Sequence, residues 1–216
     1  MSSGAFLANV VYPAVEVINA FIAPEYAKVY EVQAFTEVHM RDDGTSYLDI
    51  VLMLINYQKH GAKEANITVQ HPLLVIEMKR YHLVRLTDWT LPSLNNLHKI
   101  AESNTAKLLP QLLMYADKWD CARVYLSDYA GTIAFRVSPQ AVRAHKAGTL
   151  KVGVALCEYV QYERYRTPRS VYDYGPRMAI AFDAVEELFS LGLVTKEDIG
   201  AEPPKHEPEK LRHVSR

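Results

Sequence analysis

Residues 73–79, Leu-Leu-Val-Ile-Glu-Met-Lys, decide the fold of this chain. A short apolar run of this kind is typical of a central strand that is buried on both faces of a sheet. Because side chains alternate along a strand, Glu77 and Lys79 point to one face, and Ile76 and Met78 point to the other. The run therefore predicts a strand that delivers an acidic and a basic side chain side by side.

A second strand carries a charge inside an apolar run. Asp49 lies within residues 47–52, Tyr-Leu-Asp-Ile-Val-Leu. Burying such a charge is costly unless it is paired or binds a cation. If this strand pairs with the strand at 73–79, Asp49 and Glu77 converge, and Lys79 alone cannot neutralise both carboxylates. The two strands together therefore predict a site for a hard divalent cation.

The rest of the chain predicts further helices and strands. Apolar residues at spacings of three, four or seven indicate helices, and β-prone runs between turn residues indicate strands. Asp-Asp-Gly at 42–44 predicts a hairpin turn. The expected elements are helices at 5–21 and 25–35, strands at 37–41, 46–54 and 73–79, a helix at 93–119 kinked or restarted at Pro110, strands at 123–126, 132–137 and 152–162, and a helix at 177–193. In the last helix the expected core stripe is Ala179, Phe182, Val185, Leu188 and Phe189.

This order, helix, three strands, helix, two strands, predicts an α/β (α+β) fold with a mixed central sheet flanked by helices. The chain has 216 residues and a formal net charge of -1. We expect one domain over residues 1–200, with its core at about 25–137, and a disordered tail at 201–216 that is rich in Pro, Glu, Lys, Arg and His.

Few signals point to other protein classes. Cys121 and Cys157 have neither the density of a disulfide scaffold nor zinc-site spacing, which predicts buried thiols in a reducing compartment. The apolar stretch 5–23 lacks a basic flank and contains Pro13 and Glu16, so we expect no membrane span. The expected location is intracellular, in the nucleus or cytoplasm. Phosphate-binding glycine loops, histidine metal motifs and a nucleophile elbow are all missing from the sequence.

The arrangement resembles the PD-(D/E)XK nuclease superfamily, whose core has the same element order, with Asp on the second strand and Glu-x-Lys on the third. Gln111 and Tyr115 extend the resemblance to the RecB-like branch, in which the following helix carries Q-x-x-x-Y. Leu48 stands where the Pro that names the superfamily would be. The strand at 73–79 is also similar to that of nuclease-like domains in fungi, which suggests a fungal member.

The resemblance implies a nuclease that uses Mg²⁺ or Mn²⁺. Asp49 and Glu77 would ligate the metal, Lys79 would assist the attacking water or stabilise charge on the phosphate, and Gln111 with Tyr115 would position substrate or ligands. In that branch a Glu on the first helix often joins the metal site. Glu16 and Glu31 are the candidates here, and Glu31 is preferred because it lies nearer the hairpin.

Basic residues beside aromatic ones suggest where nucleic acid would bind. Arg80 and Arg85 follow the candidate catalytic strand, and Arg164, Arg166 and Arg169 alternate with tyrosines. Such surfaces suit phosphate contacts and base stacking, but aromatic packing with solvated arginines is an equally good interpretation. DNA is preferred over RNA as the partner, and a homodimer is left open.

Two alternatives belong to other functional classes. The fold could serve as a catalytically weak or inactive module that binds nucleic acid or a protein partner. The chain could instead be an effector or scaffold whose tyrosine-rich C-terminal half recognises a protein. Metal binding and low-salt affinity for nucleic acid discriminate among these hypotheses.

Overall fold

The computed structural model describes residues 3–39, 47–60, 64–80, 83–84, 104–128, 130–149, 157–163 and 169–194. Their elements, in chain order, are α1 (Ser3–Phe6), the π-helical turn η1 (Leu7–Val11), α2 (Tyr12–Phe21), β1 (Tyr30–His39), β2 (Tyr47–His60), β3 (Glu64–Met78), α5 (Asn104–Lys118), β4 (Arg123–Ser127), β5 (Gly131–Val137), α6 (Pro139–Lys146), β6 (Cys157–Glu163) and α7 (Arg169–Ser190).

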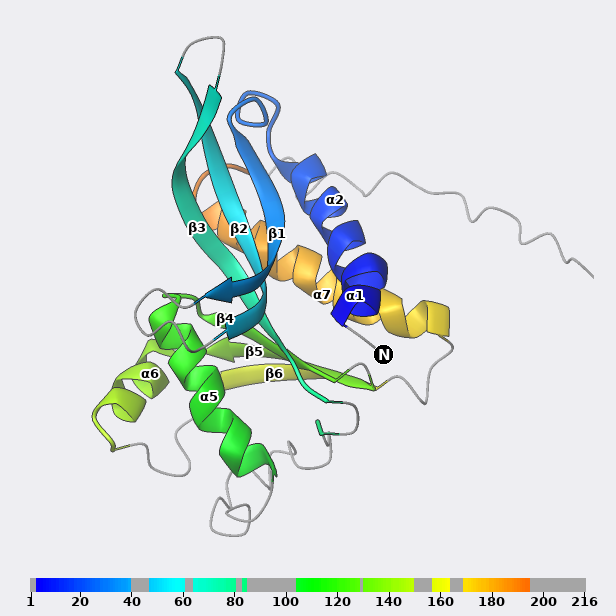
Figure 1. The fold of residues 1–216 in the computed structure, drawn as a ribbon, viewed down its shortest axis with the longest axis vertical. Coiled ribbons are helices and arrows are strands. Elements are labelled where there is room, and N and C mark those ends of the chain that lie inside the picture. Colours follow the sequence, from blue (N-terminus) through cyan, green and yellow to red (C-terminus); the bar gives the residue numbers. More distant parts are fainter. Residues whose placement is uncertain are drawn as a thin grey trace, which may run out of the picture.

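The strands form one six-stranded sheet in the order β1-β2-β3-β4-β5-β6. Neighbouring strands are antiparallel except β3 and β4, which pair in parallel. A parallel pair needs a crossover connection, and α5 lies in the segment that joins these two strands (Figure 1). The predicted mixed sheet and the order helix, three strands, helix, two strands are confirmed, and the hairpin of β1 and β2 is antiparallel as expected.

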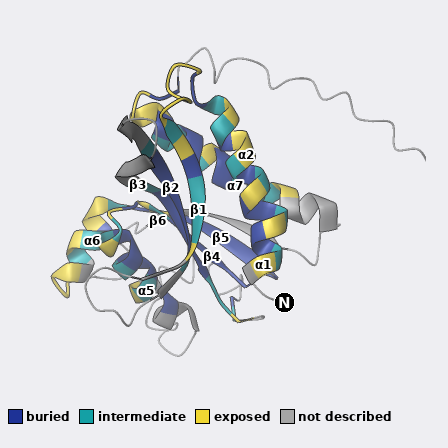
Figure 2. Ribbon diagram, turned by 45° about the horizontal axis from the view of Figure 1, so that its top comes forward, coloured by how far each residue is buried: buried dark blue, intermediate teal, exposed yellow. Residues whose placement is uncertain are grey.

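Helices cover both faces of the sheet, and its central strands are largely buried (Figure 2). The side chains of these strands contribute to an apolar core on each face. The helices α1, η1, α2 and α7 lie on one face, and α5 and α6 lie on the other (Figure 1). Strand β2 shows the alternation, because Ile50, Leu52 and Leu54 join the first core, whereas Val51, Met53 and Ile55 join the second.

The N-terminal helical segment packs into the first core. Gly4–Phe21 is long and apolar enough to cross a membrane, but the core helix of a soluble protein can have the same length and composition. Here Val10, Val11, Ala14 and Ile18 are buried against the sheet.

One predicted helix is wrong. The segment 25–35 was expected to be helical, but β1 begins at Tyr30. Residues 30 and 35 pair with residues 56 and 51 of β2, outside the range of local helical contacts, and this pairing outweighs local helix propensity. The side chain of Asn19 reinforces the strand by donating to Val32 O at 2.9 Å and accepting from Val32 N at 2.7 Å. These two bonds occupy the open edge of β1 at that point.

The other helices differ from expectation in their bounds and faces. Helix α5 continues through Pro110, and the predicted start of that helix at 93–103 lies outside the described residues. Helix α7 begins at Arg169, well before the predicted 177. Of the predicted core stripe, Val185 and Leu188 are buried, but Phe182 and Phe189 are 68% and 36% exposed. The other buried apolar residues of α7 are Ile180, Ala181 and Ala184.

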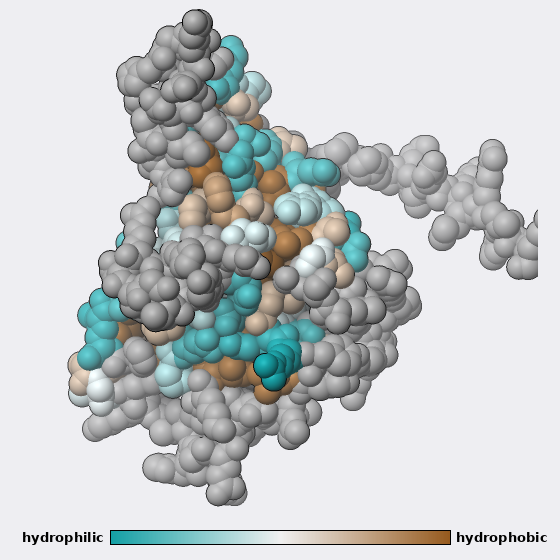
Figure 3. Space-filling model, viewed as in Figure 1, coloured by the Kyte–Doolittle hydropathy of each residue, from teal (hydrophilic) through white to brown (hydrophobic). Residues whose placement is uncertain are grey.

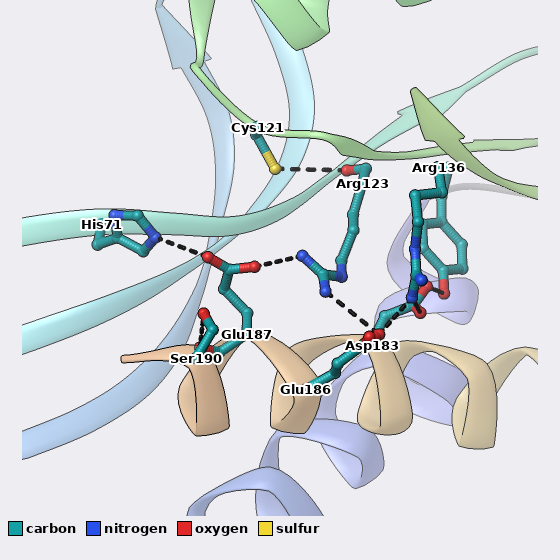
Figure 4. Close-up of polar contacts among 9 residues, drawn as sticks. His71, Cys121, Arg123, Arg136, Asp183, Glu186, Glu187 and Ser190 are labelled. Atoms are coloured by element: carbon teal, nitrogen blue, oxygen red, sulfur yellow. Dashed lines mark hydrogen bonds and ion pairs between the residues drawn. The ribbon is translucent and has the colours of Figure 1, made fainter. Parts of the chain in front are cut away.

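A cluster of charged side chains joins α7 to the sheet (Figure 4). Arg123 of β4 pairs with Glu187 and, at 3.3 Å, with Glu186. Arg136 of β5 also pairs with Glu186. Because the Arg123 side chain is only 11% exposed, its charge depends on these carboxylates.

Two further expectations concern Cys121 and the C-terminal tail. Cys121 is buried and free, as expected of a core thiol. The predicted tail at 201–216 lies outside the described residues.

Candidate active site

Asp49 and Glu77 meet where the β2–β3 ladder ends. Ile50 pairs with Ile76, so the next position along each strand is Asp49 on β2 and Glu77 on β3. The Asp49 Oδ2 atom accepts a hydrogen bond of 2.7 Å from the backbone N–H of Met78. The carboxylate is therefore held against the end of β3, in the place of a further ladder contact.

Glu77 and Lys79 share one face of β3, as their spacing predicts. The Lys79 Nζ atom donates to Glu77 Oε1 at 2.6 Å, and the side chains are 15% and 8% exposed, respectively. The backbone N–H of Lys79 donates to Ser127 O at 2.7 Å, which extends the parallel ladder with β4 by one residue. The backbone that carries Lys79 is thereby fixed.

Helix α5 supplies the other two predicted residues. Helix α5 packs against the sheet through apolar residues that are buried in the second core, namely Leu112, Leu113 and Ala116. Gln111 and Tyr115 are four residues apart and so share a helix face. The Gln111 Nε2 atom donates to Tyr115 Oη at 2.7 Å and to Glu77 Oε1 at 3.1 Å. The Gln111 Oε1 atom accepts from Lys79 Nζ at 2.8 Å, so one amide links all three groups.

Burial and the neighbouring charges perturb the pKa of Glu77. Burial raises the pKa of Glu77 above its ordinary 4.5, and the charge of Asp49 adds to this rise. The hydrogen bond and charge of Lys79, and a weaker hydrogen bond of Tyr115, oppose it. The Glu77 Oε2 atom is buried and has no hydrogen-bond partner among the described residues. Burial, followed by the Glu77 charge, raises the pKa of Tyr115 well above its ordinary 10.0, so its hydroxyl keeps its proton at neutral pH.

The group fits a hard divalent cation. Two neighbouring carboxylates, one with a buried oxygen that lacks a partner, are ligands that such ions prefer. In the part of the chain that the structure describes, no cluster of three or more His, Cys, Asp or Glu side chains could hold a metal. Two carboxylates suffice for Mg²⁺, which keeps several waters and takes substrate phosphates as further ligands.

The structure does not bring Glu31 or Glu16 to this group. Glu31 lies opposite Ile55, hydrogen-bonds Gln33 at 3.2 Å and is exposed. Since Thr36 lies opposite Ile50, Glu31 is about 17 Å further along the strand. Glu16 is exposed on α2, which covers the face opposite α5. The expectation that Glu31 is a metal ligand is therefore corrected, because residues 30–39 form a strand and not a helix.

Sequence reasoning missed the backbone position of Glu37 and the contacts of Asp128. The register places the backbone of Glu37, between Thr36 and Val38, opposite Asp49. Asp128 is 1% exposed and accepts hydrogen bonds of 2.9 Å each from the backbone N–H groups of Val84, Ala130 and Gly131. It thus ties the segment after Lys79 to the β4–β5 turn. The Asp-x-x-Gly spacing of 128–131 signals the turn, but not the contact with Val84.

The predicted nucleic-acid-binding arginines are only partly described. Arg80 is exposed and directly follows Lys79. On the face seen in Figure 1, hydrophilic side chains lie in both the upper and the lower part of the described surface, with the larger group in the lower part (Figure 3). Arg169 is the first residue of α7. Arg85, Arg164 and Arg166 lie outside the described residues.

The fold and the site together define a mixed α/β protein in which two carboxylates and a lysine converge at the end of the central strand. No family model matches the chain, and no curated protein matches it in sequence. Among solved structures, it is similar to the type IIG restriction endonuclease BpuSI, with 15% identity and a TM-score of 0.37. The match covers 88% of this chain but only 18% of the BpuSI chain.

Proposed function

We propose that the protein is a metal-dependent nuclease of the PD-(D/E)XK type. The observation that carries this proposal is the buried Oε2 atom of Glu77, which has no hydrogen-bond partner among the described residues although Asp49 and Lys79 are close by. A buried carboxylate oxygen without a hydrogen bond is costly to a fold and is accounted for if it serves as a ligand. Gln111 and Tyr115 favour the RecB-like branch.

Each residue has a role in phosphodiester hydrolysis. Asp49 and Glu77 would hold Mg²⁺ or Mn²⁺, which supplies Lewis acidity and lowers the pKa of bound water. The Lys79 ammonium would donate to the phosphate oxygens as their negative charge grows. Gln111 holds that ammonium in place through its Oε1 atom. Water would add to phosphorus and give up one proton to solvent, the phosphorus–oxygen ester bond would break, and the leaving oxygen would take a proton from solvent.

DNA is the substrate that we propose. The exposed Arg80 beside Lys79 would contact a backbone phosphate. The net charge of -1 means that binding depends on such local basic residues and not on the charge of the whole chain.

The test combines manganese calorimetry with plasmid nicking on Asp49→Asn, Glu77→Gln and Lys79→Met. Matched controls are Asp117→Asn and Lys146→Met, which remove the same charges from a partly exposed ion pair of 2.5 Å between α5 and α6. We expect the acid variants to lose Mn²⁺ binding, and all three site variants to lose nicking by at least about 100-fold. Lys79→Met should still bind the metal, and both controls should act as the wild type.

Other outcomes assign a different function. Nicking that survives in Glu77→Gln and Asp49→Asn would refute the proposed site. A wild type that binds DNA but neither binds Mn²⁺ nor nicks it would establish the alternative of a non-catalytic binding module. A wild type with no affinity for DNA at low salt would favour a protein-binding scaffold.

A further inference from the structure

Helix α7 carries an exposed stripe of large apolar side chains, here called the α7 stripe. It consists of Tyr174, Met178, Phe182 and Phe189, which are 56%, 41%, 68% and 36% exposed. Successive spacings of four, four and seven residues place all four on one side of a helix. Core packing does not account for this stripe, because α7 meets the sheet through other residues.

The remaining sides of α7 are already occupied within the chain. Asp183, Glu186 and Glu187 rise from the helix toward the arginines of β4 and β5 (Figure 4). On another side α7 packs beside η1 and α2, and Arg177 Nη2 donates to Asn9 O at 2.7 Å. The α7 stripe is thus the side of the helix that these contacts leave exposed.

The area of the stripe suits a stable dimer. From the exposed fractions and typical side-chain areas, the stripe presents about 400 Å² per copy, comparable to the largest patch on a typical monomer. Two copies would bury about 800 Å² between them. Because interfaces are roughly 60% apolar, the whole contact would reach about 1,300 Å², within the range of specific protein interfaces.

The charge beside the stripe argues against nucleic acid and anionic membranes as partners. The acidic row Asp183, Glu186 and Glu187 borders the stripe, and Glu186 is itself 42% exposed. Nucleic acid and anionic membranes are attracted by basic surfaces, which this row does not provide. The acids are also paired with Arg123 and Arg136, so a second copy is not strongly repelled.

We propose that the α7 stripe is the interface between two copies of this chain, related by a two-fold axis. Antiparallel packing of α7 against α7 is self-complementary, since the same patch serves both copies. An axis that passes between Met178 and Phe182 sets the methionine of one copy against the phenylalanine of the other, a favourable sulfur–aromatic contact. The site of the proposed function lies on the opposite face of the sheet, so this inference stands independently of nuclease activity.

The test is the molar mass of the full chain by light scattering and sedimentation over about 1 to 100 µM, a range in which a dimer of ordinary affinity forms and dissociates. We expect the wild type to be a dimer at high concentration and Phe182→Glu to be a monomer, because it sets charge against an apolar surface. Tyr12→Glu is the matched control, since it adds the same charge at a residue on α2 that is 50% exposed.

Phe182→Leu should remain a dimer with weaker association, and thermal melting should show that Phe182→Glu is folded. A wild type that stays monomeric over the whole range would overturn the proposal. So would a Phe182→Glu variant that dimerises as the wild type does, or a Tyr12→Glu variant that dissociates to the same extent.

Discussion

Replacing Lys79 by Met should destabilise the protein through the acid it leaves behind. Lys79 donates to Glu77 at 2.6 Å, and both side chains are nearly buried. Removing one partner of a buried ion pair typically costs about 3 to 5 kcal/mol, because an uncompensated charge remains. Gln111 still donates to Glu77 Oε1 at 3.1 Å, so we expect the low end of that range, about 3 kcal/mol.

The loss should depend on pH with a definite sign. The pKa of Glu77 is already raised by burial above its ordinary 4.5, and losing Lys79 raises it further. A raised pKa means that the folded state binds the proton more tightly, so stability falls as pH rises from 4.5 through the folded pKa. The deficit of Lys79→Met should therefore be largest above the folded pKa and should shrink toward pH 4.5.

Urea unfolding at about pH 5 and about pH 8 measures this effect. The double variant Glu77→Gln, Lys79→Met should recover most of the loss at the higher pH, because it has no buried charge. Lys146→Met serves as the control, since it breaks a partly exposed pair and should cost less than about 1 kcal/mol. A Lys79→Met deficit that is the same at both pH values, or that persists in the double variant, would refute the reasoning.

Three further expectations concern metal binding, the ion pairs of Arg123 and the hydrogen bonds of Asp128. Mn²⁺ at about 100 times its Kd should add about 2.7 kcal/mol to the free energy of unfolding and raise Tm by about 5 to 10 °C in a melting assay. Glu77→Gln should show no such rise in Tm. Arg123→Met should cost about 1 to 3 kcal/mol in urea unfolding, because Glu187 then keeps only its contact with His71 at 3.5 Å. Adding Glu187→Leu should restore most of this loss, whereas additive losses would contradict the reasoning. Asp128→Asn should lose the bond from Val84 at a cost of about 1 to 3 kcal/mol, and unchanged hydrogen exchange of the Val84 amide would count against it.

The sequence predicted the central strand and its charged end because short-range patterns set both. The apolar run at 73–79 is typical of a strand covered on two sides, and strand alternation then places Glu77 beside Lys79. The turn at 42–44 similarly predicted the hairpin of β1 and β2. Gln111 and Tyr115 followed from helix periodicity, which needs no knowledge of distant contacts.

Features that depend on distant contacts were predicted wrongly or missed. Residues 30–35 have mixed propensity, and only pairing with β2 makes them a strand. Glu31 was preferred as a ligand on the assumption of a helix, so that error followed from the first. Phe182 fits an apolar stripe by spacing, yet α7 turns a different side to the core. Helical periodicity identifies an apolar side without saying whether the chain itself or another molecule covers it.

Asp49 illustrates why the choice of substitution matters at this site. Its Oδ2 atom accepts from the Met78 N–H where the β2–β3 ladder ends, so the carboxylate also satisfies a backbone donor of β3. Alanine would remove the charge and leave that N–H without its partner, which mixes lost metal affinity with a disturbed strand end. Asparagine keeps an oxygen acceptor of the same reach and removes only the charge. Lost metal binding in Asp49→Asn, with an unchanged melting temperature of the metal-free protein, can therefore be attributed to the missing ligand charge itself.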